Sequence, residues 1–222
     1  MKNLLSSLIL ATLLIGGNAT ADETLKTVYE DRSDISQLMY KWGFYRDHGM
    51  WDELRTTFHP EGQIQVTWFT GKFSEFVDAS IKMAEGGAES VHQIKPSIVD
   101  VVGDRAIAIT PASITARANP GVELDLSSEA YFFDFVERRD GDWKILRRIC
   151  IYQKDRMDTV LPSFRFWLMS WFIDTETYDP AYKFLGSALA MQGYTIGQQV
   201  VDNTDQSRAL YAEGQTWLHE GS

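Results

Sequence analysis

The sequence predicts an α+β fold, in which helices in the first part of the chain lie against a curved antiparallel sheet. Apolar residues recur at helical spacing before residue 85, whereas from residue 91 they recur at every second position. Connections with hairpin chemistry, at 103–104, 119–121 and 140–142, separate the long alternating segments. Helices followed by consecutive antiparallel strands indicate a sheet covered on one face by helices.

The composition of the 222-residue chain is that of a globular protein, with 44% hydrophobic and 23% charged residues. Its formal net charge is −10, and the sequence contains no long run of Lys and Arg. Binding to nucleic acid or to an anionic membrane needs clustered positive charge, so neither is an expected partner. Aromatic residues form 13% of the chain, which indicates a large core or an apolar pocket.

Residues 1–21 have the pattern of a secretory signal peptide. Lys2 precedes an apolar run from Leu4 to Ile15, and Ala19-Thr20-Ala21 is an A-x-A cleavage signal. The run is too short to span a bilayer comfortably. We therefore expect cleavage after Ala21 and a secreted or periplasmic protein without stable membrane insertion. An uncleaved N-terminal anchor is the alternative.

Few residues of the chain are suited to disulfide or metal chemistry. Cys150 is the only cysteine, so no intramolecular disulfide can form. The four histidines show neither HExxH nor i, i+4 spacing, and no metal site is predicted. GxGxxG, P-loop and GxSxG patterns are absent, which lowers the expectation of a nucleotide-dependent enzyme or a serine hydrolase.

Three helices are predicted before the sheet. Residues 22–30 form a short lead-in to the first helix, which ends at Gly49. Its apolar positions follow a spacing of three and four residues: Ile35, Leu38, Met39, Trp42 and Tyr45. A short second helix places Trp51, Leu54 and Phe58 on one face. A third helix spans Lys72 to Ala84, before Gly86 and Gly87.

The predicted strands come mainly after the third helix. Residues 59–62 form a turn, and residues 63–69 form a first strand. Four long strands follow: Val91–Val102, Arg105–Ala118, Leu124–Arg139 and Trp143–Lys154.

The character of the chain changes after Asp158, so we divide it into a domain of residues 22–157 and a C-terminal helical extension of residues 158–222. Residues 164–173 are dense in aromatic rings, and three roles are open for them: closing a pocket, joining copies of the chain, or packing on the sheet. Two further helices are predicted, one after Asp179-Pro180 and one from Asp205 to Trp217. A homo-oligomer is expected, because an exposed face of a curved sheet usually needs covering.

Several motifs in residues 30–156 resemble those of SnoaL-like domains, which belong to the nuclear transport factor 2-like superfamily. They are Tyr40-Lys41-Trp42, Asp47, Trp51-Asp52-Glu53-Leu54, Phe58-His59-Pro60-Glu61-Gly62, Val91-His92 and the hairpin from Glu137 to Ile145. The resemblance implies a cone-shaped curved sheet around a long helix, enclosing an apolar pocket. The pattern is most similar to the branch holding scytalone dehydratase, bile-acid dehydratase and lindane dehydrochlorinase, which use an Asp–His dyad without a metal or organic cofactor.

By this resemblance, the dyad falls on Asp47 and His92, and an arginine of the last strand falls on Arg148. Histidine is well matched to proton transfer near neutral pH, and a carboxylate on its far nitrogen fixes the tautomer. His92 has the strand parity of Ile94, so it should point to the apolar side. Arg148 should likewise point inward and hold a leaving group or oxyanion. Trp42 stands where relatives often carry Lys or Tyr, which leaves a second proton donor open.

The same residues also have structural interpretations. His92 could be a hydrogen-bonded core histidine, Asp47 a residue that binds backbone N–H groups, and Arg148 an ion-pair partner at the rim, with Arg147 as the alternative in the pocket. The predicted apolar lining consists of Trp42, Ile64, Ile114, Phe132 and Tyr152.

Three functions follow as hypotheses, of which the last is an assembly protein whose sheet face makes the interface. The first is a cofactor-independent lyase or isomerase that acts on a small hydrophobic or cyclic substrate. The second is a non-catalytic binding protein for such a molecule, since one fold serves both uses.

Overall fold

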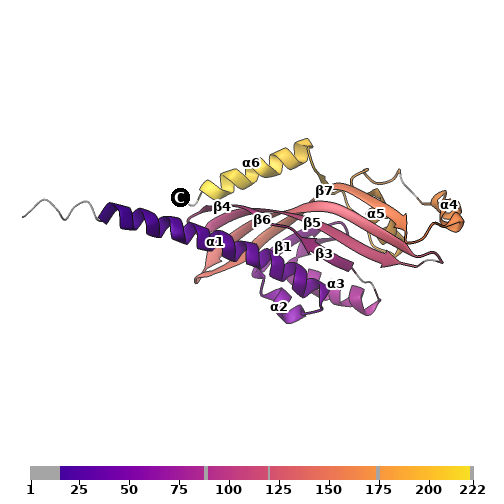
Figure 1. The fold of residues 1–222 in the computed structure, drawn as a ribbon, viewed down its shortest axis with the longest axis horizontal. Coiled ribbons are helices and arrows are strands. Elements are labelled where there is room, and N and C mark those ends of the chain that lie inside the picture. The colour runs from indigo at the N-terminus through magenta and orange to yellow at the C-terminus, as the bar shows by residue number, and fades with distance from the viewer. Residues whose placement is uncertain (1–15, 88–89, 120, 174–175, 221–222) are drawn as a thin grey trace, which may run out of the picture.

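The structure is a computed structural model, and it describes residues 16–87, 90–119, 121–173 and 176–220 (Figure 1). Eight strands and six helices occur in these residues. The helices are α1 (Gly16–Asp47), α2 (Trp51–Arg55), α3 (Phe73–Glu85), α4 (Phe164–Ser170), α5 (Lys183–Met191) and α6 (Asp205–His219). The strands are β1 (Phe58–Val66), β2 (Phe69–Lys72), β3 (Ser90–Ile94), β4 (Ile98–Val102), β5 (Arg105–Ala118), β6 (Leu124–Arg139), β7 (Asp142–Thr159) and β8 (Val200–Val201).

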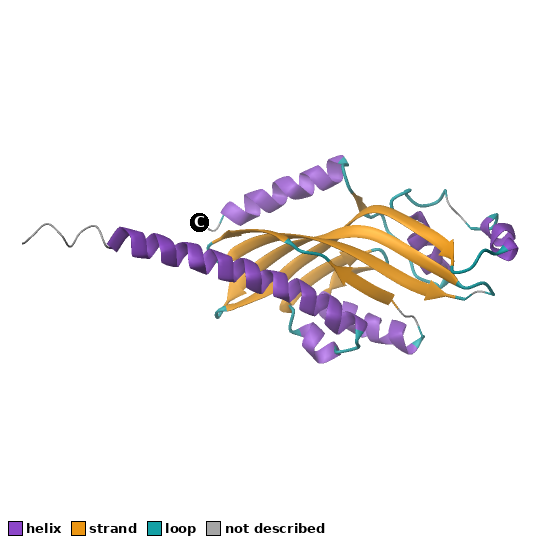
Figure 2. Cartoon of the chain, viewed as in Figure 1, coloured by secondary structure: helices purple, strands orange, loops and turns teal. Residues whose placement is uncertain are grey.

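All eight strands belong to one curved sheet with the order β2-β1-β7-β6-β5-β3, while β4 also pairs with β5 and β8 with β7 (Figure 2). The long strands β5, β6 and β7 pair antiparallel through the two hairpins that the turn residues predict. The pairings of β1 and β8 with β7 are parallel, which the long connections between these strands permit. The predicted α+β class is confirmed.

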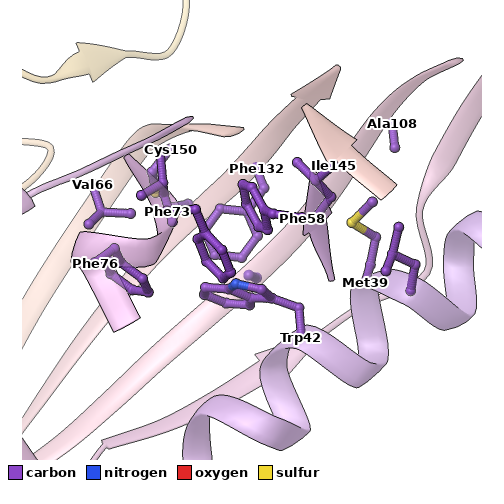
Figure 3. Close-up of a cluster of buried hydrophobic side chains, with 14 of the residues drawn as sticks. Met39, Trp42, Phe58, Val66, Phe73, Phe76, Ala108, Phe132, Ile145 and Cys150 are labelled. Carbon is purple, nitrogen blue, oxygen red and sulfur yellow. The ribbon is translucent and has the colours of Figure 1, made fainter. Parts of the chain in front are cut away.

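The concave face of the sheet is covered by α1, α2 and α3 (Figure 1). Helix α1 buries the apolar positions that its spacing predicts, and Ile35, Met39 and Trp42 have at most 1% of their surface exposed. The helix begins before the predicted start, since residues 22–30 are helical rather than a lead-in; this segment contains no proline or glycine that would stop it. Figure 3 shows Trp42 and Met39 of α1 facing aromatic and aliphatic side chains of the sheet and α3.

Two predicted strands have different bounds in the structure. The segment 91–102 is split into β3 and β4, because Pro96 lacks the N–H that a continuous ladder requires. The predicted turn at 59–62 lies inside β1, where the pairing with β7 shifts between Phe58 and Gln63. A Cβ on Gly62 would lie only 2.9 Å from the carbonyl oxygen of His59, so this irregular backbone requires glycine.

The convex face is covered by α6, which lies on the opposite side of the sheet from α1 (Figure 1). Leu210 and Leu218 of α6 are buried against Phe133, Phe135 and neighbouring side chains of the sheet. Thr204 and Ser207 form a capping box that begins the helix. The chain thus covers this face of the sheet with its own last helix.

Most side chains of the ring-dense segment are exposed. Helix α4 has no buried residue, and Phe164, Trp167, Trp171 and Phe172 are each more than half exposed. Within the described residues, no helix has both the length and the apolar composition needed to cross a membrane. The predicted signal segment up to residue 15 lies outside the described residues.

Candidate functional site

Asp47 and His92 form a hydrogen-bonded pair, although 45 residues separate them in the sequence. Nδ1 of His92 lies 2.5 Å from Oδ1 of Asp47, and the backbone N–H of His92 donates to Oδ2 at 2.6 Å. Both side chains are about nine-tenths buried, with 9% and 11% of their surface exposed. Both oxygens of the carboxylate therefore hold one residue, which fixes the histidine in position and orientation.

The fold brings the pair together at the end of α1 and the edge of the sheet. Strand β3 is an edge strand, so the N–H of His92 on its outer side is free to bond a side chain rather than another strand. One turn before Asp47, Gly43 allows α1 to approach β3. A Cβ at Gly43 would lie 2.5 Å from Cγ1 of Ile94. Helix α1 ends directly after Asp47, where Gly49 adopts a left-handed φ of 65°.

The contacts of the pair determine which nitrogen of His92 can act as a base. When the Nδ1–H group donates to Asp47, Nε2 carries the lone pair and can accept a proton. In the part of the chain that the structure describes, no protein group bonds to Nε2. The carboxylate also stabilises the imidazolium that forms once Nε2 has taken up a proton.

His92 lines a cavity of about 120 Å³ on the concave side of the sheet. The apolar residues of its wall are Trp42, Val66, Trp68, Phe76, Met83, Ile114, Ala116, Leu126, Phe132, Leu185, Ala188 and Leu189. The polar residues are Arg46, Thr67, Ser90, His92, Tyr152 and Gln192. A cavity of about 150 Å³ lined by aliphatic and aromatic side chains holds one benzene molecule, so this space suits a molecule of about one ring.

Helix α5 supplies part of the cavity wall. Its residues Leu185, Ala188 and Leu189 belong to the wall, and Leu185 and Leu189 are buried in the main core. Asp155 at the end of β7 accepts the backbone N–H of Leu185 at 2.8 Å, which ties the start of α5 to the sheet. This cavity is thus largely apolar, and its wall contains both aromatic rings and the side chain of His92.

This arrangement can be compared with known proteins. SnoaL-like domains match residues 27–149, which is more than half of the chain. The chain belongs to the SnoaL-like domain family. The sequence resemblance is therefore confirmed, and with it the expected curved sheet around a long helix.

Relatives of this SnoaL-like protein include curated fungal proteins. Pea pathogenicity protein 2 of Fusarium vanettenii is 30% identical over 163 residues, which cover 70% of this chain and 67% of that protein. A PEP2-like protein of the same fungus is 27% identical over 208 residues, which cover 85% of each chain.

Solved structures show the same fold. A scytalone dehydratase-like protein from Novosphingobium aromaticivorans has a TM-score of 0.53 and 18% identity, over 60% of this chain and 90% of its own. A protein of unknown function from Mycobacterium tuberculosis has a TM-score of 0.52 and 14% identity, over 79% and 96% of the two chains. At sequence identities of 18% and 14%, the similarity to these two structures establishes the fold and nothing more.

The structure places four of the five predicted lining residues in the cavity wall of this SnoaL-like protein: Trp42, Ile114, Phe132 and Tyr152. The prediction for Ile64 is corrected, because its side chain is 2% exposed within the core and does not line the cavity. The hydroxyl of Tyr152 accepts the N–H of Thr67 at 2.9 Å, and burial raises the pKa of Tyr152.

The prediction for Arg148 is also corrected, because its guanidinium does not line the cavity. Arg148 is fully buried, and its Nε and Nη2 donate to the two oxygens of Asp134 at 2.7 and 2.8 Å. The charge lies 4.3 Å from the ring centroid of Trp42 and 4.2 Å from that of Phe132. These two rings belong to the cavity wall, so Arg148 supports the wall from behind.

Two other histidines, His48 and His59, contact backbone carbonyl groups and do not line the cavity. His48 is exposed and stacks on Phe44, and its Nδ1 lies 2.8 Å from the carbonyl oxygen of Phe44. His59 is buried, with Nε2 at 3.0 Å from the carbonyl oxygen of Glu137. Within the described residues, His, Cys, Asp and Glu side chains form no group of three suited to a metal ion.

Sequence reasoning missed Arg46 and the wall residues from α5. The sequence predicts a helix after Asp179-Pro180, but no local signal relates that helix to a histidine at position 92. Arg46 directly precedes Asp47, and its charge gave no sign that the side chain is buried.

Proposed function

We propose that this protein is a cofactor-independent lyase or isomerase that acts on a small hydrophobic or cyclic substrate. The observation that carries the proposal is the buried Asp47–His92 pair, whose histidine lines an apolar cavity. His92 Nε2 removes a proton from a carbon of the substrate, and Asp47 holds the imidazole and the imidazolium in place.

The reaction balances without a redox partner. The electron pair of the broken C–H bond forms a C=C bond, and a leaving group on the adjacent carbon departs with its own bonding pair. The imidazolium then gives the proton to the leaving group or to solvent, which restores the neutral base. In an isomerase, the imidazolium returns the proton to another carbon of the same molecule.

The experiment begins with mass spectrometry of small molecules that co-purify with the protein, which supplies a ligand. Loss of a C–H proton from that ligand is then followed in D2O by NMR, together with product formation. His92→Ala should reduce the rate by about 10²–10⁴-fold, the usual contribution of general base catalysis. Asp47→Asn should cost less, because the base remains but loses its orientation.

The matched control is His48→Ala, which removes an exposed histidine near the same end of α1 and should leave the rate unchanged. The two residues of the pair act as one unit, so the double variant should be no slower than His92→Ala. Tight ligand binding with neither exchange nor product in the unaltered protein would instead establish the binding function.

We also propose that the protein is exported through its N-terminal segment. The support is the order of Lys2, the apolar run from Leu4 and the A-x-A signal ending at Ala21.

A further inference from the structure

Arg46 is a buried cation between two hollows of the protein surface. It is the residue before Asp47, only 9% of it is exposed, and it lines the cavity that contains His92. It also lines an outer cleft that contains Asp47, His48 and Trp51. An arginine in this position can be reached by a molecule bound in the cavity.

The contacts of Arg46 leave its charge without a carboxylate partner. Nη2 lies 3.8 Å from the sulfur of Met83, and the guanidinium carbon lies 5.6 Å from the ring centroid of Trp51. Among the described residues, no carboxylate lies within 4.0 Å of its guanidinium nitrogens. The nearby carboxylate, Asp47, is already bonded through both oxygens to His92.

The other arginine of the outer cleft differs from Arg46 in this respect. Arg117 is half exposed and forms two hydrogen bonds, of 2.8 and 2.9 Å, with Asp125. Burial lowers the pKa of Arg46, while the negative charge of Asp47 opposes that change. A guanidinium nevertheless stays protonated in proteins, so a largely buried positive charge is held here without a direct ion-pair partner among the described residues.

We propose that Arg46 is the anion-binding residue of this cavity, and that the ligand bound beside His92 carries a carboxylate or an equivalent oxyanion on an apolar body of about one ring. A guanidinium recognises a carboxylate with two parallel hydrogen bonds, and these are strong where water is excluded. An anionic oxygen would supply the charge that the protein itself does not provide.

This inference deepens the proposed function and rests on it for the identity of the cavity as a ligand site. It adds that the substrate has two ends. The apolar end contacts the aromatic wall, and the charged end is held by Arg46 at the mouth, so that a carbon between them meets Nε2 of His92.

The test compares benzoate with benzamide, two single-ring probes that differ in charge. Binding is measured by titration calorimetry and by the fluorescence of the tryptophans. The unaltered protein should bind benzoate at least ten times more tightly than benzamide. Arg46→Met should lose about ten- to hundredfold in benzoate affinity, as expected for hydrogen bonds to a charged group, with benzamide affinity unchanged.

Two further variants make the result specific. Arg46→Lys keeps the charge and should retain part of the preference for benzoate. Arg105→Met is the matched control: Arg105 also lies over a tryptophan, at 4.9 Å from the ring centroid of Trp217, but on the opposite face of the sheet. It should bind both probes as the unaltered protein does.

Equal affinity of the unaltered protein for the two probes, or the absence of saturable benzoate binding, overturns the proposal. The same holds if Arg46→Met binds benzoate normally. Failure of the proposed catalysis looks different, because His92→Ala would then turn over ligand normally while the preference for benzoate remained intact.

Discussion

The buried pair formed by Asp134 and Arg148 offers a test that needs no substrate. The two residues face each other across β6 and β7, and neither side chain is exposed. Replacing Asp134 with Leu leaves the guanidinium charged and unpaired beneath Trp42. Removing one member of a buried ion pair costs about 3–5 kcal/mol, which for a protein of this size lowers Tm by about 6–20 °C.

Replacing both members should cost far less than the sum of the single changes. Asp134→Leu combined with Arg148→Met fills the same space with apolar side chains and leaves no buried charge, an exchange that is often near neutral. Arg148→Met alone leaves Asp134 unpaired, and burial raises the pKa of that carboxyl, so it can take up a proton instead. Protonation stabilises this variant at low pH, and the stabilisation is lost as the pH rises, so its deficit should be smaller at pH 5 than at pH 8.

Urea unfolding followed by circular dichroism, with Tm measured in parallel, gives these free energies. The control pair is Arg117 and Asp125, which also face each other across neighbouring strands and form two hydrogen bonds, but at the exposed end of β5 and β6. Replacing Asp125 should cause no resolvable loss. The reasoning is refuted if Asp134→Leu is no worse than this control, or if the double variant loses the full sum.

Three other predictions can be checked directly. Burial raises the pKa of the Cys150 thiol to about 12, so this thiol in the native protein should resist thiol reagents at pH 8. The free energy of unfolding should fall between about pH 9 and 12, where the thiol ionises in the unfolded chain but not in the native protein. Urea titrations of Cys150→Ala should show a weaker dependence of this free energy on pH. A Cβ on Gly214 would lie 2.6 Å from Cζ of Phe133, so Gly214→Val should lower Tm and speed amide exchange in α6, whereas the open site at Gly197 should accept valine. N-terminal sequencing of exported protein should begin at Asp22; recovery of the intact N-terminus from membranes would contradict this.

The position of the dyad could be predicted because family motifs and strand parity both act locally. His92 shares its face of β3 with Ile94, as the alternation requires, and Asp47 ends the helix whose apolar face the spacing reveals. The same parity argument placed Arg148 on the inner face, which is correct. Parity does not show how far along a strand a residue lies relative to the cavity, however, and Trp42 and Phe132 lie between Arg148 and the cavity.

The sequence also could not predict which residue pairs with Arg148. Asp134 lies in a run of aromatic residues on β6, and only the register between β6 and β7 brings it opposite Arg148. The contribution of α5 to the cavity depends on the path of the chain after β7, which no periodicity encodes. Both the Asp134–Arg148 pair and the α5 residues of the cavity wall depend on contacts between distant segments, which local sequence patterns do not encode.

Helix α5 places part of the cavity wall outside the family domain, so the residues that contact a ligand and the Asp47–His92 pair lie partly in different segments of the chain. The family match ends at residue 149, whereas α5 follows it and is fastened to the sheet through Asp155. The Asp47–His92 pair belongs to the shared domain, whereas Leu185, Ala188 and Leu189 of the cavity wall belong to the appended helix. Exchange of this one helix between relatives offers a route to new ligand preferences with the chemistry left intact, and a library confined to residues 183–191 would sample that diversity.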